Sequence, residues 1–109
     1  MVLSEQINIL LHPTSSERVS IPDISFTVLK EDRHFYSAVV ACQSTKGTPP
    51  VTFSLYNRTE LVASMTVDDR NATFKVPLVL DRHLGWLQCQ ANNGDQTEYS
   101  QSIPLEVGM

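Results

Sequence analysis

The sequence predicts an all-β fold, an antiparallel β-sandwich made by one domain. Three observations predict it: apolar and polar residues alternate along five short segments, turn-forming residues separate these segments, and two cysteines fall on their apolar side. Strict alternation is typical of antiparallel strands with one buried and one solvated face. The chain has 109 residues, 41% of them hydrophobic, which is enough for the core of one ordinary domain.

The five alternating segments are the expected strands, and their inward residues are the expected core. They are residues 36–42 (Tyr36, Ala38, Val40, Cys42), 51–55 (Val51, Phe53, Leu55), 72–78 (Phe74, Val76, Leu78), 87–91 (Leu87, Cys89, Ala91) and 103–107. Turn residues rich in Gly, Pro, Asn and Asp occupy 46–50, 68–71 and 92–95. Short strands at this spacing indicate a sandwich or a barrel. Pro77 and Pro104 lack a backbone donor, so they are expected on edge strands or at bulges.

The two cysteines, Cys42 and Cys89, allow two interpretations. Free thiols pack as small hydrophobic side chains, whereas a disulfide needs an oxidising compartment. Asn57 and Asn71 each begin an Asn-x-Thr pattern, which is the acceptor for N-glycosylation and favours export. The sequence therefore predicts a disulfide in an extracellular protein, with two free thiols as the alternative.

Both cysteines lie at inward positions of central strands, and a disulfide joining two sheets through the core is the arrangement of immunoglobulin domains. Residues 42–56 resemble C2-type immunoglobulin domains of the Fc-receptor-like group and of the platelet–endothelial cell adhesion molecule. In those domains a cysteine is followed by a short polar stretch, Gly-x-Pro-Pro and a strand with an aromatic residue. Residues 71–76 and 85–94, which end in Cys-x-Ala-x-Asn-Gly, resemble later strands of the same domains.

The resemblance implies an immunoglobulin-like domain over residues 24–109 with one inter-sheet disulfide. Phe53 stands where these domains usually have a tryptophan, and Leu87 stands where they have a tyrosine. The hydrogen bond of the tyrosine corner is therefore expected to be replaced or lost. Residues 1–23 have no counterpart in the resemblance and are expected to be an N-terminal arm, a first strand or a remnant of a preceding domain.

The candidate protein interface consists of Trp86, Tyr56 and Tyr99. If Leu87 and Cys89 point inward, Trp86 points outward, and an exposed tryptophan on a sheet is a typical anchor of protein interfaces. Tyr56 and Tyr99 are expected on the same face or at its rim, unless they serve ordinary cross-strand packing.

Other function classes find little support in the composition. Eight Lys and Arg against twelve Asp and Glu, a net charge of −4, lack the cationic surface of a nucleic-acid binder. No apolar run approaches the roughly 20 residues of a membrane helix. No catalytic, metal-binding or cofactor motif is present, so neither enzyme activity, a metal nor a cofactor is expected. No export signal is visible, which indicates a mature or excised part of a longer protein.

The sequence therefore predicts a non-catalytic, extracellular protein-recognition module of an immune-type receptor or adhesion protein, whose partner is another protein. The alternatives are a small secreted, cytokine-like member of the immunoglobulin superfamily and a structural spacer in a longer ectodomain. A fold alone does not define function, so the choice among them depends on the site.

Overall fold

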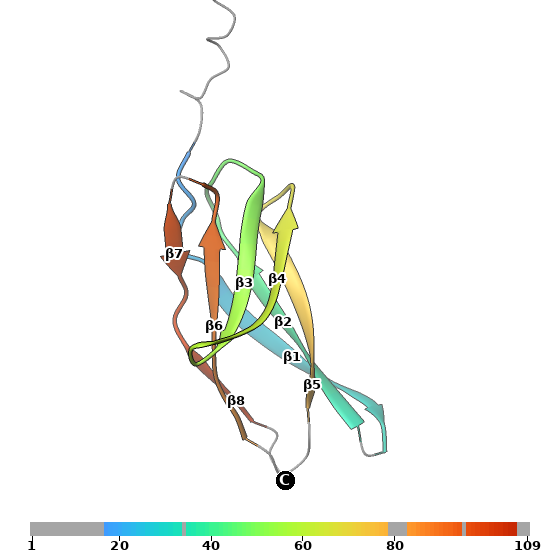
Figure 1. The fold of residues 1–109 in the computed structure, drawn as a ribbon. Coiled ribbons are helices and arrows are strands. Elements are labelled where there is room, and N and C mark those ends of the chain that lie inside the picture. Colours follow the sequence, from blue (N-terminus) through green and yellow to red (C-terminus); the bar gives the residue numbers. More distant parts are fainter. Residues whose placement is uncertain (1–16, 34, 79–82, 95, 107–109) are drawn as a thin grey trace, which may run out of the picture.

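The computed structural model describes residues 17–33, 35–78, 83–94 and 96–106, which form two antiparallel sheets packed face to face (Figure 1). The three-stranded sheet has the order β1 (Asp23–Asp32), β2 (Phe35–Gln43) and β5 (Asn71–Leu78). The five-stranded sheet has the order β4 (Glu60–Val67), β3 (Val51–Asn57), β6 (His83–Asn92) and β7 (Thr97–Tyr99), and β8 (Ile103–Glu106) also pairs with β6. The predicted β-sandwich is confirmed.

The predicted strands lie in β2, β3, β5, β6 and β8, and their predicted inward residues line the space between the sheets. Phe53 and Leu55 of β3 and Leu87 of β6 are among the largest fully buried side chains. Leu87, which stands where the similar immunoglobulin domains have a tyrosine, is an ordinary core residue. Pro77 lies on β5, an edge strand of its sheet, and Pro104 lies on β8, which pairs with β6 alone, as their missing donors require.

Three further strands, β1, β4 and β7, are not among the five predicted segments. Strand β4 has two adjacent apolar residues, Leu61 and Val62, and is largely exposed, so it carries no clear period of two. Strand β7 has three residues, which is too short for a periodic signal. Strand β1 alternates at Ile24, Phe26 and Val28, but only Ile24 is buried.

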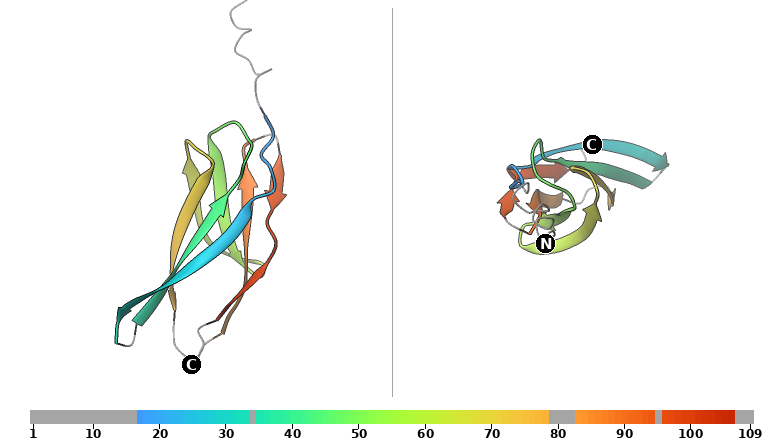
Figure 2. Two further views of the ribbon diagram at one scale, coloured as in Figure 1. Left: turned by 180° about the vertical axis from the view of Figure 1, so that it is seen from behind. Right: turned by 90° about the horizontal axis from the view of Figure 1, so that it is seen from above.

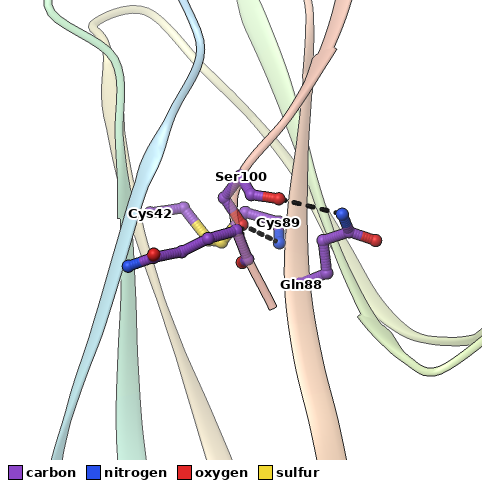
Figure 3. Close-up of a disulfide and its surroundings, with 5 residues drawn as sticks. Cys42, Gln88, Cys89 and Ser100 are labelled. Carbon is purple, nitrogen blue, oxygen red and sulfur yellow. Dashed lines mark hydrogen bonds between the residues drawn. A yellow bond between two sulfur atoms is a disulfide. The ribbon is translucent and has the colours of Figure 1, made fainter. Parts of the chain in front are cut away.

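A disulfide joins the two sheets at the centre of the core (Figure 3). It links Cys42 of β2 to Cys89 of β6, whose Cα atoms are 6.1 Å apart, and both residues are fully buried. The predicted pairing is confirmed, and the alternative of two free thiols is wrong. In the chain-entropy model, closing a loop of this length stabilises the fold by about 4 kcal/mol.

Ser100, between β7 and β8, attaches this part of the chain to β6 beside the disulfide (Figure 3). The backbone N–H of Cys89 donates to Ser100 Oγ over 2.8 Å, and the N–H of Ser100 donates to the Cys89 carbonyl over 2.9 Å. The Gln88 side-chain amide donates to the Ser100 carbonyl over 2.8 Å. These bonds satisfy buried polar groups where the β6–β7 ladder gives way to the β6–β8 ladder.

The segment before β1 also packs against the domain. Val19 and Pro22 are buried, and the N–H of Thr48 donates to the Glu17 carbonyl over 3.1 Å. Gly47 has φ 130°, and a Cβ there would lie 2.8 Å from the Val19 Cα, so only glycine permits this close approach. Residues 1–16 lie outside the described residues, and the predicted division of the chain at residue 24 stays a prediction.

The β1–β2 hairpin runs past the edge of the five-stranded sheet, as both views of Figure 2 show. Its strands are paired in continuous register from Asp23 opposite Gln43 to Lys30 opposite Tyr36, and the register shifts only between Lys30 and Asp32, next to the hairpin end. The inner face of β1 therefore begins inside the sandwich and continues beyond it.

Candidate functional site

The outer face of the five-stranded sheet carries the predicted interface residues. Along β6, Leu87, Cys89 and Ala91 point into the core, so the residues between them point outward. Those outward residues are Trp86, Gln88 and Gln90. Because neighbouring strands place paired residues on the same face, β3 and β7 add their own outward side chains to this surface.

A pocket of about 300 Å³ opens on this face. Its lining comes from β3, the β3–β4 turn, β6 and β7, and consists of Tyr56, Arg58, Thr59, Gln88, Gln90 and Tyr99. Tyr56 lies opposite Gln88, and Tyr99 lies opposite Gln90, so the pocket spans three neighbouring strands. The Gln90 amide donates to the Tyr99 hydroxyl over 3.1 Å, which holds this edge of the pocket in place. Tyr56 and Tyr99 thus lie in one pocket on this face, and their role in a protein interface stays a prediction.

The β3–β4 turn directs Arg58 to the pocket. Asn57 pairs with Glu60 across a two-residue turn, and Arg58 adopts a positive φ of 60°. Such a conformation is common in tight hairpin turns, although side chains other than those of glycine and asparagine rarely adopt it. The N–H of Arg58 donates to the Trp86 carbonyl over 2.9 Å, so the turn is attached to β6.

Gly85 makes room for this turn. It has φ +96°, and a Cβ built on it would lie 2.9 Å from Asn57 Oδ1 and 3.3 Å from Arg58 Nε. A larger residue would therefore suffer backbone strain and would displace both side chains. Gly85 thus allows the guanidinium group to lie against the backbone of β6, beside Trp86.

Trp86 lies beside the pocket and not within its lining. It pairs with Pro104 of β8, and 43% of its surface is exposed. It shares the outer face with Gln88, two residues further along β6. A half-exposed tryptophan next to a pocket that contains two tyrosines matches the composition of interface cores, in which aromatic residues are enriched.

Arg58 is the one charged residue in the pocket lining. Among the described residues no carboxylate forms an ion pair with it. An arginine presents a planar array of donors that fits a carboxylate with two parallel hydrogen bonds. The pocket therefore offers a guanidinium group, without a carboxylate partner among the described residues, between aromatic and amide side chains, in a chain whose net charge is −4.

An ion pair lies away from the pocket, on the outer face of the three-stranded sheet. Lys75 of β5 and Glu31 of the β1–β2 hairpin approach within 2.9 Å. Hydrogen bonds from Lys75 and from the Ser37 hydroxyl lower the pKa of the Glu31 carboxyl below its usual value. This pair holds the end of the hairpin against β5 and takes no part in the pocket.

The two glycosylation patterns occupy different environments. Asn71 is exposed at the first position of β5. Asn57 is the last residue of β3 rather than a residue beyond it, and it is half-buried, with Oδ1 directed toward Gly85. The structure therefore leaves Asn71 more accessible than Asn57, and occupancy of either site stays a prediction.

The described residues hold no group of three His, Cys, Asp or Glu side chains that is arranged to bind a metal ion. Among the described residues there is no helix long and apolar enough to span a membrane.

The sequence model of a family described as the C17orf99 Ig domain matches residues 19–107. The chain belongs to this family. The match to C17orf99 Ig domains includes every strand of both sheets and the Cys42–Cys89 bridge, and it confirms the predicted membership of the immunoglobulin superfamily. Immunoglobulin domains are typically protein-binding modules without catalytic activity. No match was found among curated proteins or among solved structures.

Four residues of the pocket were not predicted: Arg58, Thr59, Gln88 and Gln90. The alternation of β6 does contain a signal for the two glutamines, because they occupy the outward positions next to Trp86. No sequence signal marks Arg58, whose position depends on the positive φ of the turn and on the absence of a side chain at Gly85 in another strand.

Proposed function

We propose that this C17orf99 Ig domain is an extracellular protein-recognition module of an immune-type receptor or adhesion protein. The observation that carries the proposal is the exposed Trp86 beside a pocket lined by Tyr56 and Tyr99, on the outer face of the five-stranded sheet. Large aromatic side chains that are ordered before binding contribute much of the affinity of protein interfaces, because little side-chain entropy is lost on association.

The chemistry of the pocket suggests what the partner presents. The guanidinium group of Arg58 favours a carboxylate, and the neighbouring tyrosines favour an apolar or aromatic side chain next to it. We therefore expect the partner to place an aspartate or glutamate, flanked by an apolar residue, over the pocket. Such a contact is directional, because the guanidinium group is held against β6.

The buried disulfide and the exposed Asn71 support an extracellular location. Structural disulfides persist in oxidising compartments and are rare in the cytosol. Mass spectrometry of the protein recovered from its native cells is expected to find Cys42 and Cys89 oxidised and Asn71 glycosylated. Reduced cysteines together with an unmodified Asn71 would contradict the extracellular assignment.

The recognition face is tested by screening the chain, as a tetramer, against an array of cell-surface and secreted ectodomains. We expect a specific partner whose Kd rises about tenfold or more for Trp86→Ala and for Arg58→Gln, since truncating an interface anchor costs at least about 1.4 kcal/mol. Gln43→Ala, at an exposed position on the outer face of the other sheet, is the matched control and leaves the Kd unchanged. A partner that tolerates both pocket-side variants would exclude this face, and the absence of any partner would favour a structural spacer.

A further inference from the structure

The outer edge of β1 is the longest regular strand edge that the described residues leave without a partner. Strand β1 pairs with β2 on one side, and in the part of the chain that the structure describes no strand pairs with its other side. Its register with β2 is continuous for eight residues, from Asp23 to Lys30. An open edge of this kind presents a row of free backbone donors and acceptors to another strand.

The other open edges of the two sheets are interrupted or, as in the three-residue strand β7, short. A register shift between Leu55 and Tyr56 of β3 produces a bulge opposite them in β4. Pro77 lies in β5 and Pro104 lies in β8, and each removes a backbone donor. Bulges and prolines are the devices by which proteins protect strand edges from pairing. Strand β1 has neither between Asp23 and Lys30.

The side chains of β1 are also left uncovered. Phe26 and Val28 point to the inner face of the sheet, like the fully buried Val40 and Ala38 opposite them, yet they are 37% and 39% exposed. The inner-face residues Ala63 and Val67 of β4, by contrast, are half-buried and pack on the core. The open edge of β1 therefore coincides with an apolar surface that the domain covers only in part.

The sequence of β1 is complementary to a second copy of itself. When two β1 strands lie antiparallel with Thr27 opposite Thr27, Phe26 lies opposite Val28 twice on the inner face. Ser25 then lies opposite Leu29 twice on the outer face. Aromatic–β-branched pairs and Thr–Thr pairs are among the favourable cross-strand combinations. A two-fold axis through the Thr27 pair produces this arrangement, and such isologous contacts are the commonest among homo-oligomers.

Charge also favours this register. The five residues from Ser25 to Leu29 carry no ionisable side chain, so two copies of a chain with net charge −4 meet there without a like-charge contact. Further out, Asp23 would lie opposite Glu31, which is already held by Lys75 over 2.9 Å. The pairing is therefore expected to end before these residues and to be short.

We propose that the chain forms a two-fold homodimer by antiparallel pairing of β1 with β1 about Thr27. The dimer joins two three-stranded sheets into one six-stranded sheet and covers Phe26 and Val28 of each copy. Because the paired segment is short, the contact is smaller than a standard stable interface, and association in the micromolar range or weaker is expected. The pocket beside Trp86 lies on the other sheet, so the dimer and the proposed recognition face are independent.

The register is tested by cysteine cross-linking of the full chain. Directly opposite residues of antiparallel strands have Cα atoms about 4.5–5.5 Å apart, which is within the span of a disulfide. We expect Thr27→Cys to form a covalent dimer under mild oxidation. Ser25→Cys and Leu29→Cys are each expected to form no covalent dimer alone. When the two variants are mixed, a covalent dimer is expected. Thr66→Cys, at an outward position of the other edge strand β4, is the matched control and is not expected to cross-link.

The association itself is tested by sedimentation velocity from micromolar to millimolar concentration. We expect Val28→Lys to raise the dimer Kd about tenfold or more, because it places an ammonium group opposite Phe26. Leu61→Lys, the matched change on β4, is expected to leave it unchanged, with circular dichroism confirming that both variants fold. A wild-type chain that stays monomeric at all concentrations overturns the proposal. So does a dimer that appears only after residues 1–16 are removed, since that segment would then occupy the edge.

Discussion

Two phenylalanines at the same level of the three-stranded sheet differ in burial. Phe26 of β1 and Phe74 of β5 flank Val40 of β2, and all three side chains point to the inner face. Phe74 is 4% exposed, whereas Phe26 is 37% exposed. The difference arises because the five-stranded sheet covers β5 and the central part of β2 but not the hairpin that extends beyond it (Figure 1). Alternation thus predicts the face of a side chain, while the second layer determines its burial.

The strongest test of this comparison truncates the two phenylalanines in turn. Phe74→Ala is expected to lower the free energy of unfolding by about 3–5 kcal/mol, since it removes a buried aromatic ring and leaves a cavity. Phe26→Ala is expected to lower it by about 1–2 kcal/mol, since the residue is 37% exposed and only the covered part of its surface is lost. Urea denaturation at low protein concentration, where the proposed dimer is dissociated, measures both values. Equal losses would contradict the difference in cover between the two edges of this sheet.

A second test compares Ser100, which lies beside the buried disulfide, with Ser25 on the exposed strand β1. Ser100→Ala leaves the buried N–H of Cys89 without its acceptor, so we expect a loss of about 1–3 kcal/mol in the free energy of unfolding. Ser25→Ala removes an exposed hydroxyl from β1 and is expected to change it by less than about 0.5 kcal/mol. Thermal and urea denaturation of both variants provide the comparison, and an unaffected Ser100 variant would show that the bond is replaced.

The smallest expected effect concerns the ion pair between Glu31 of the β1–β2 hairpin and Lys75 of β5. Lys75 and Ser37 lower the pKa of Glu31 in the folded chain, so the folded state binds this proton less readily than the unfolded chain does. The stabilisation is therefore present above the ordinary pKa of glutamate and is lost as the pH falls through the lowered value. We expect Glu31→Gln to reduce the stability slightly at neutral pH and to flatten the acid limb of a pH–stability profile.

The control for this last test is Glu98→Gln, at a half-buried carboxylate of β7 in the other sheet. It is not expected to change the part of the acid limb that depends on Lys75. If Lys75→Gln leaves the acid limb of the wild-type profile intact, the assignment of this limb to the Glu31–Lys75 pair is wrong.

The sequence predicts most of the strands that the opposite sheet covers, because their burial imposes a regular alternation of apolar and polar residues. In β2, β3, β5 and β6 every second side chain enters the core, so a strict alternation is required and is visible. The inward positions of both cysteines follow from the same pattern, whereas the disulfide between them is favoured over free thiols by the two Asn-x-Thr patterns. Strand β4 and the uncovered part of β1 escape this requirement, and their exposed side chains provide a weaker signal.

The candidate site divides in the same way. The outward orientation of Trp86 follows from the inward positions of Leu87 and Cys89, and Gln88 and Gln90 share that orientation. The contribution of Arg58 does not follow from any local pattern, because it depends on a positive φ in one hairpin and on the missing side chain of Gly85 in another strand. Pairings between distant strands are needed to bring these residues together.

By itself, the sequence determined the fold class, the core of the central strands, the bridge between Cys42 and Cys89 and the outward orientation of Trp86. The period of two is a local property of the chain, and for these features it is sufficient. The tertiary structure alone decided that Tyr56, Tyr99 and Arg58 share one pocket and that Phe26 and Val28 remain uncovered. The pocket depends on which strands pair with one another, and the exposure of Phe26 and Val28 depends on how far the opposite sheet extends over β1. Both are contacts between residues far apart in the sequence, so no local periodicity indicates them.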